Sequence, residues 1–369
     1  MLISSFSLKL KIMNFLCLIK SSVVFGLVLM TSVAALAQSS EDYRQQEIRR
    51  LEAIKNGFDV FLNQRVSDRE RIAAVAAYPI AKDPAQVKAL KVTVNNSNAS
   101  PAIRVVALRS VLDYIQGDGP FFNQVMEYLA SPTTPKAFRD ECLRSVGVVS
   151  FSAFGMQQVA EDILNVYRGL LTDKDINYRR DAYHKLAQGG DDVAQQNLIN
   201  GLKDAQELPL PADECIRLLA YDIKGDYYPV IHEIAQSTSE LKIKVAAIEV
   251  LGNYVPARED IIASLNDTNE SKEVRLAALK TLNAFDKENF TLYAEGVLQG
   301  PDAPVEVVIY AINAEKYRRL APGFRQKSGD TFDQTVKALL NRQKSQQDTS
   351  QDLVRKSALN YLNTLGIEN

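Results

Sequence analysis

The chain has 369 residues, of which 46% are hydrophobic and 24% are charged, and its formal net charge is −2. This length exceeds one ordinary hydrophobic core, so either two domains or an array of repeats is expected, and the composition excludes a disordered chain. The nearly balanced charge disfavours a nucleic-acid partner, which would need a basic patch.

The first 37 residues are predicted to be a signal peptide. Three lysines precede an apolar run from Val23 to Met30, and the small residues of a cleavage site follow at 35–37. The rival interpretation is an uncleaved anchor, but the apolar run is short for the about 20 residues that cross a bilayer. We therefore expect cleavage after Ala37 and an exported protein, periplasmic or secreted, with no membrane span in the mature chain. Met1 and Met13 both remain candidate start residues.

The remaining chain, 38–369, begins with two predicted helices. Apolar residues fall at helical spacing over 41–65, which predicts one amphipathic helix. Ser67 and Glu70 then have the spacing of a capping box, in which each side chain binds a free backbone N–H at the start of a helix. We therefore expect a second helix to start directly after Ser67.

One sequence pattern recurs from this second helix onward. Its clearest copy is Ser271–Phe285, where a cation follows an apolar residue, a small residue comes three positions after the cation, and an apolar residue comes seven positions after it. The matching cations are Arg71, Arg104, Arg139, Arg179, Lys244, Arg275 and Arg355. Most are about 34 positions apart, and the two longer separations predict degenerate copies near 205–225 and 303–330. About nine helix pairs are therefore expected.

The order apolar–Arg–x–x–Ala–Leu, followed by a further Leu, resembles the HEAT repeat in its short bacterial form, which phycobilin lyases also contain. Tetratricopeptide and ankyrin repeats have a similar period, but this chain has no Trp and no Thr-Pro-Leu-His. The resemblance covers roughly 41–366. It implies an all-α fold, a right-handed α-α superhelix, in which 38–369 is a single repeat domain and stacked helix pairs share one core.

The repeated cations have two interpretations. Their equivalent positions place them along one side of the array, where they form either an anion-binding row or a set of structural residues. The structural interpretation, which the HEAT resemblance favours, pairs each cation with an acid or with carbonyl groups of the neighbouring repeat. Acids that lie near the cations in sequence include Asp68, Glu240 and Glu270.

Cysteine and histidine give little indication of chemistry. Cys142 and Cys215 lie two predicted units apart, farther than a disulfide can reach, so we expect no disulfide and two buried thiols. HEAT-like deoxyhypusine hydroxylases bind iron through several His–Glu pairs, whereas this chain has only His232-Glu233. No phosphate-binding loop, nucleophile elbow or haem motif occurs. We therefore predict no catalytic, cofactor-binding or metal-binding residues, and no cofactor.

The sequence favours a non-enzymatic scaffold or adaptor of the cell envelope, which binds a protein partner through its curved surface. The alternative is an enzyme, or a binder of a small anionic or glycan ligand in the concave groove. The pattern breaks around Ile216–Tyr228 and Val305–Asp330, so a partner surface is sought there first. The candidate partner-binding residues are Tyr221, Tyr227, Tyr228, Arg139 and Arg179.

Overall fold

The computed structural model describes residues 42–367, except 116, 153–156, 205–206, 223, 301, 325–330 and 344–348. The predicted signal peptide and its cleavage site therefore lie outside the described residues. All regular elements within the described part are helices. The predicted all-α class is confirmed.

The chain forms two compact units, one extending to Ile163 and the other beginning at Leu164. The first unit starts with a helix over 42–62, which corresponds to the helix predicted over 41–65. The helices that follow are α2 (Asp68–Ala74), α3 (Pro84–Asn95), α4 (Pro101–Ser110), α5 (Gly119–Ala130), α6 (Lys136–Ser152) and α7 (Gln157–Leu170), the last of which contains the boundary.

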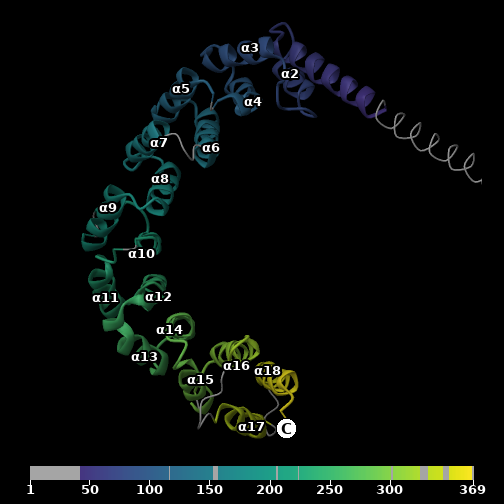
Figure 1. Ribbon diagram of the computed structural model, residues 1–369. Coiled ribbons are helices and arrows are strands. Elements are labelled where there is room, and N and C mark those ends of the chain that lie inside the picture. Colours follow the sequence, from purple (N-terminus) through teal and green to yellow (C-terminus); the bar gives the residue numbers. More distant parts are fainter. Residues whose placement is uncertain are drawn as a thin grey trace, which may run out of the picture. The chain divides into compact units, whose positions relative to one another are not determined.

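The helices of the first unit are arranged in two layers (Figure 1). α4 packs between α2 and α6, while α3 packs against α4 and α5 packs against α6. The side chain of Gln86 in α3 donates to the carbonyl oxygen of Lys55 at 2.9 Å, which ties α3 to the helix over 42–62. The predicted capping box starts α2, because Ser67 and Glu70 each bind the backbone N–H of the other. That prediction is confirmed.

The second unit continues the same arrangement of helix pairs. Its helices are α8 (Ile176–Gln188), α9 (Asp192–Lys203), α10 (Ala212–Leu219), α11 (Tyr228–Ser237), α12 (Leu241–Val250), α13 (Arg258–Asn266), α14 (Lys272–Phe285), α15 (Phe290–Gln299), α16 (Val305–Leu320), α17 (Phe332–Gln343) and α18 (Thr349–Leu365). Two short 3₁₀ helices, Leu251–Asn253 and Val255–Ala257, join α12 to α13. Successive even-numbered helices from α8 to α18 contact one another, and each odd-numbered helix from α9 to α17 packs on the next even-numbered one. The two layers are visible in Figure 1.

The repeated small and apolar positions form the core of both units. The small residue three positions after the cation is fully buried in six copies, at Ala107, Cys142, Ala182, Ala247, Ala278 and Ala358. The apolar residue seven positions after the cation is also buried, at Val111, Val146, Leu186, Leu251, Leu282 and Leu362. Small side chains allow the helices to approach closely, and the larger ones fill the space between them. The packing role predicted for these positions is confirmed.

Four of the repeated arginines bind the preceding helix through the same contact, which we call the arginine clamp. In each, Nε donates to the carbonyl oxygen of the residue ten positions earlier, which is the penultimate residue of that helix. The acceptors and distances are Phe61 at 2.6 Å for Arg71, Val94 at 2.8 Å for Arg104, Leu129 at 2.7 Å for Arg139 and Leu265 at 2.9 Å for Arg275.

The arginine clamp satisfies a carbonyl that the end of a helix leaves without an intrahelical partner. It also places a cation at the negative end of the helix dipole. The structural interpretation of these four cations is therefore confirmed, with one difference. The clamp carbonyl lies in the preceding helix of the same pair, but the expected partners also occur. Arg71 pairs with the acid Asp68, and Arg275 also donates to the carbonyl oxygen of Asp302 in the neighbouring repeat.

In the degenerate copy near 303–330, an arginine of another helix binds the carbonyl at the end of the preceding helix. Val308 occupies the position of the cation, ten residues after Leu298, the penultimate residue of α15. The carbonyl oxygen of Leu298 instead accepts from Nη2 of Arg342 in α17, at 2.9 Å. The carbonyl at the end of α15 is thus bound although the repeated cation is missing.

Candidate functional site

The candidate partner-binding residues differ in their exposure to solvent. Tyr227 and Arg139 are buried, whereas Tyr221 is 49% exposed. Tyr228 is partly exposed and its ring stacks on that of Tyr254, with ring centroids 5.2 Å apart. Burial raises the pKa of Tyr227 well above its ordinary value. Of these three tyrosines, Tyr221 therefore presents the most surface to a partner.

Arg179 lies outside the arginine clamp and binds two other stretches of backbone. Its Nη1 donates to the carbonyl oxygen of Asp173 at 2.6 Å, and its Nε donates to that of Pro209 at 3.1 Å. Pro209 lies thirty positions later in the chain, so Arg179 links its own helix to the connection before α10. The guanidinium is engaged with backbone oxygens, as that of Arg139 is.

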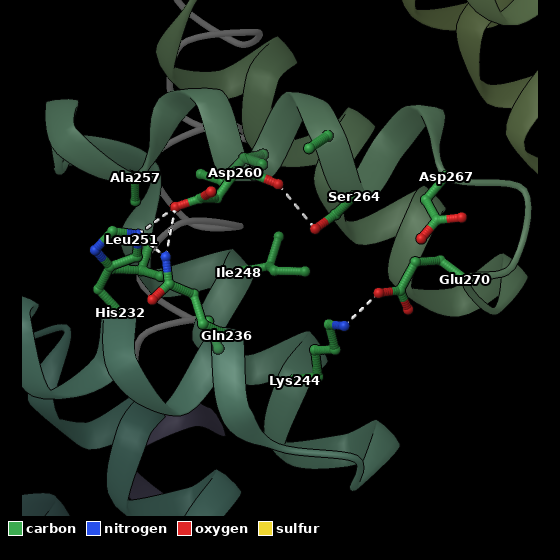
Figure 2. Close-up of a pocket in the computed structure, with 13 residues that line it drawn as sticks. His232, Gln236, Lys244, Ile248, Leu251, Ala257, Asp260, Ser264, Asp267 and Glu270 are labelled. Atoms are coloured by element: carbon green, nitrogen blue, oxygen red, sulfur yellow. Dashed lines mark hydrogen bonds and ion pairs between the residues drawn. The ribbon is translucent and has the colours of Figure 1, made fainter.

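A pocket of about 290 Å³ lies among α11, α12, α13 and the connection to α14 (Figure 2). It lies within the second unit and adjoins the first stretch where the repeated pattern breaks. α11 contributes His232 and Gln236, α12 contributes Lys244, and α13 contributes Asp260. The sequence pattern identified only the lysine of this group as a repeated position.

One end of the pocket is held by a hydrogen-bonded group on Asp260 (Figure 2). Nε2 of His232 lies 2.6 Å from Oδ2 of Asp260, and Nε2 of Gln236 donates to the same oxygen at 2.9 Å. These contacts join α11 to α13. The hydrogen bond from His232 is the main reason why the pKa of the Asp260 carboxyl lies below its ordinary value of 3.8. The carboxylate is therefore ionised at neutral pH.

The other end of the pocket holds an ion pair between Lys244 and Glu270 (Figure 2). The side chains are 21% and 20% exposed, so water reaches the pair only in part. Asp267 lies beside Glu270 and accepts a hydrogen bond from the backbone N–H of Asn269 at 2.8 Å. Glu270 was among the acids expected to partner the repeated cations, and the pairing with Lys244 confirms that expectation.

Lys244 does not form the arginine clamp because the end of α11 is arranged differently. The residue ten positions before it is Ile234, which lies three residues before the end of α11 instead of one. The carbonyl oxygen of Ile234 already accepts from the backbone N–H of Thr238, at 2.9 Å. The ammonium of Lys244 therefore pairs with the carboxylate of Glu270 in the pocket.

The walls of the pocket are aliphatic. Ile248, Leu251 and Ile261 are almost fully buried, and alanines of α11, α13 and the second 3₁₀ helix complete the lining. The charged side chains that line the pocket are three carboxylates, of Asp260, Asp267 and Glu270, and the ammonium of Lys244. The pocket thus combines apolar walls with a surplus of negative charge.

The groups that could react in this pocket have structural partners. The Ser264 hydroxyl donates to the backbone carbonyl oxygen of Asp260 at 2.9 Å, so its proton is not directed at His232. Within the described residues, no group of three or more His, Cys, Asp or Glu side chains is placed to hold a metal ion.

Cys142 and Cys215 are both free and buried, which agrees with their prediction as buried thiols. Burial raises the pKa of each thiol to about 12. Over the part of the chain that the structure describes, no helix is long and apolar enough to cross a membrane.

In comparisons with known proteins, no family model and no curated protein matches this chain.

Sequence reasoning missed most of this pocket. The sequence named His232, Lys244 and Glu270 separately and did not place them together. Lys in place of Arg at position 244 could have pointed to the pocket, because a lysine cannot make the forked contacts of a guanidinium. Asp260 gave no signal, since it lies 28 positions from His232 and matches no repeated position. Only the fold of the connection between α12 and α13 brings these two side chains together.

Proposed function

We propose that this protein is a non-enzymatic binding protein of the cell envelope that takes a protein partner. In this proposal the chain is exported after removal of residues 1–37, and its helix pairs form a right-handed superhelix of about nine HEAT-like units. The pocket among α11, α12 and α13 receives a basic side chain of the partner. The partner is thus recognised by at least one Lys or Arg residue that inserts between successive helix pairs.

One observation carries the proposal, namely the combination of aliphatic walls with three carboxylates around one ammonium. Lys and Arg side chains likewise combine an apolar stem with a charged end, so they match the apolar walls and the carboxylates of the pocket. The stem can lie along Ile248 and Ile261 while the charged end binds Asp260 or Asp267. An anionic ligand does not fit, because it would meet the surplus of carboxylates.

The contacts of the repeated cations weigh against the alternative of an anion-binding row. An anion-binding row would need guanidinium groups that are open to a ligand. Arg139 is 4% exposed and binds the carbonyl oxygen of Leu129, and Arg179 binds backbone oxygens of two loops. These contacts support packing roles for both residues.

A photo-crosslinking residue placed at Val255 tests the proposal in intact cells. Val255 is 68% exposed and lies two residues before Ala257, which lines the pocket. We expect a reproducible adduct with one protein, in which the crosslinked segment contains Lys or Arg. Replacing both Asp260 and Asp267 by Asn should reduce the adduct strongly, because the variant removes two of the three carboxylates.

The control places the same crosslinker at Leu292 in α15, which is 66% exposed and does not line the pocket. An adduct that forms equally from position 292, or one that the double Asn variant does not reduce, would contradict the proposal. Failure to obtain any adduct from position 255 would count against a partner at this pocket.

A further inference from the structure

A second pocket, of about 840 Å³, lies between α14 and α16, which are neighbours in the even-numbered layer (Figure 1). Residues 321–324 of the connection after α16 also line it. It belongs to the second stretch in which the repeated pattern breaks. Its size falls within the range of about 300–1,000 Å³ that small-molecule sites occupy. Alanines at positions 284 and 314 leave the space open between the two helices.

Two tyrosines of α16 line this second pocket. Tyr310 and Tyr317 are seven positions apart, so they lie on one side of the helix and about 10 Å apart along its axis. Tyr317 is 67% exposed, and its ring lies 4.8 Å from the ammonium of Lys316. The two phenol rings can therefore contact different parts of one extended ligand.

Two amides lie beside these rings. Asn283 of α14 donates from Nδ2 to the hydroxyl oxygen of Tyr310 at 3.0 Å, which fixes both side chains. Asn313 lies on α16 between the two tyrosines and also lines the pocket. An amide both donates and accepts hydrogen bonds, and a phenol does the same. The pocket thus offers both donors and acceptors next to aromatic surfaces.

The charge of this pocket differs from that of the first. Its lining includes Lys287 and Arg318 and no carboxylate side chain. Arg318 is paired, because its Nη1 donates to Oε2 of the buried Glu315 at 2.7 Å. A cationic ligand would therefore find no counter-charge in this lining.

We infer that this second pocket binds an oligosaccharide. The C–H groups on the flat face of a sugar ring pack on the negative face of an aromatic ring. The sugar hydroxyl groups, which are both donors and acceptors, match the amides and the phenol. Two rings from positions about 10 Å apart along the helix axis can contact two sugar residues of one chain. This site goes beyond the proposed protein-binding function and uses none of the residues of the first pocket.

Isothermal titration of the full chain with hexasaccharides tests the inference. The probes are neutral hexamers of β-linked glucose and of N-acetylglucosamine, and an anionic hexamer of galacturonic acid. We expect at least one of them to bind. Tyr317→Ala should weaken that binding roughly five- to tenfold, because an aromatic contact is lost. Asn313→Ala should weaken it as well. Lys287→Gln should weaken only binding of the anionic hexamer.

Tyr43→Ala is the control, since it removes an exposed tyrosine of the first unit that lines neither pocket. It should leave saccharide binding unchanged. Tyr317 is largely exposed, so its replacement should not unfold the protein, and circular dichroism checks this. The inference is overturned if no hexasaccharide binds, or if Tyr317→Ala and Asn313→Ala leave binding unchanged. An array of synthetic octapeptides tests whether the pocket binds a peptide instead. Binding of peptides without binding of any hexasaccharide would also overturn the inference.

Discussion

Two adjacent helix pairs of the second unit place the same repeated cation in different surroundings. In the α13–α14 pair, Arg275 is 6% exposed and donates to the carbonyl oxygens of Leu265 and Asp302, at 2.9 and 3.1 Å. In the α11–α12 pair, Lys244 pairs with Glu270 at the edge of a pocket. In this comparison, Arg275 packs the fold because a helix-end carbonyl is within reach, whereas Lys244 has no such carbonyl and lines a pocket.

The difference begins in the connection between the helices of each pair. Arg275 follows the penultimate residue of α13 by ten positions, whereas Lys244 follows the penultimate residue of α11 by only eight. The shorter connection moves the free carbonyl out of register with the cation. A shift of two residues thus changes the role of the side chain without changing the arrangement of the helices.

The largest effect is expected for Arg275→Met, which removes both hydrogen bonds and leaves a helix-end carbonyl without a partner. We expect a loss of about 2–3 kcal/mol in the free energy of unfolding, measured with urea. Lys244→Met is the matched variant in the neighbouring pair. It should cost about 1 kcal/mol or less, because its ion pair is partly solvated. Equal losses in the free energy of unfolding for the two variants would contradict the claim that Arg275 stabilises the fold more than Lys244 does.

A smaller loss, of about 1 kcal/mol, is expected for Arg342→Met in α17. Arg342 supplies the clamp on Leu298 that Val308 cannot make, so its removal should destabilise α15 in particular. Hydrogen exchange of the last amides of α15 measures this effect. Asn341→Met replaces the neighbouring exposed residue and should leave these amides unchanged. An unchanged exchange rate in Arg342→Met would show that the contact does not stabilise α15.

Asp260 makes the stability of the first pocket depend on pH. Its pKa is lowered in the folded protein, mainly by the hydrogen bond from His232. This contribution to stability is therefore present above the ordinary carboxyl pKa of 3.8 and is lost as the pH falls through the lower folded value. As the pH falls from 5 to 2, we expect the free energy of unfolding to decrease less in the Asp260→Asn variant than in the wild type. Identical profiles would contradict this assignment.

The smallest effect concerns the two buried thiols. Because the thiolate is the reactive form, a pKa of about 12 predicts that Cys142 and Cys215 resist a thiol reagent at pH 8 in the folded protein. Both should react at once in denaturant. Rapid labelling of either residue in the folded protein would show that its helix opens readily.

The all-α class and the buried positions were predictable from the sequence, whereas the sites were not. The recurrence of a cation, a small residue and a later apolar residue predicted the buried positions at Ala107 and Leu282 correctly. It could not predict that Arg342 binds a carbonyl 44 positions earlier, because that contact replaces a repeated one with a residue of the next helix pair. The pairing of His232 with Asp260 likewise depends on how the 3₁₀ connection after α12 places α13 relative to α11. The repeated pattern therefore predicts which residues are buried, but it does not predict the pockets, which lie near the stretches where the pattern breaks.

Methyl NMR of the full chain, titrated with an acetylated and amidated lysine, tests the central claim most directly. The methyl groups of Ile248 and Ile261 line the first pocket and report on its occupant, and Ile103 lies in the first unit as an internal control. We predict saturable shifts at Ile248 and Ile261, none at Ile103, and their loss in the Asp260→Asn and Asp267→Asn double variant. The same titration with acetylated and amidated norleucine, whose side chain is aliphatic and uncharged, should give no shifts. Equal shifts with both compounds, or none with lysine, would contradict the account.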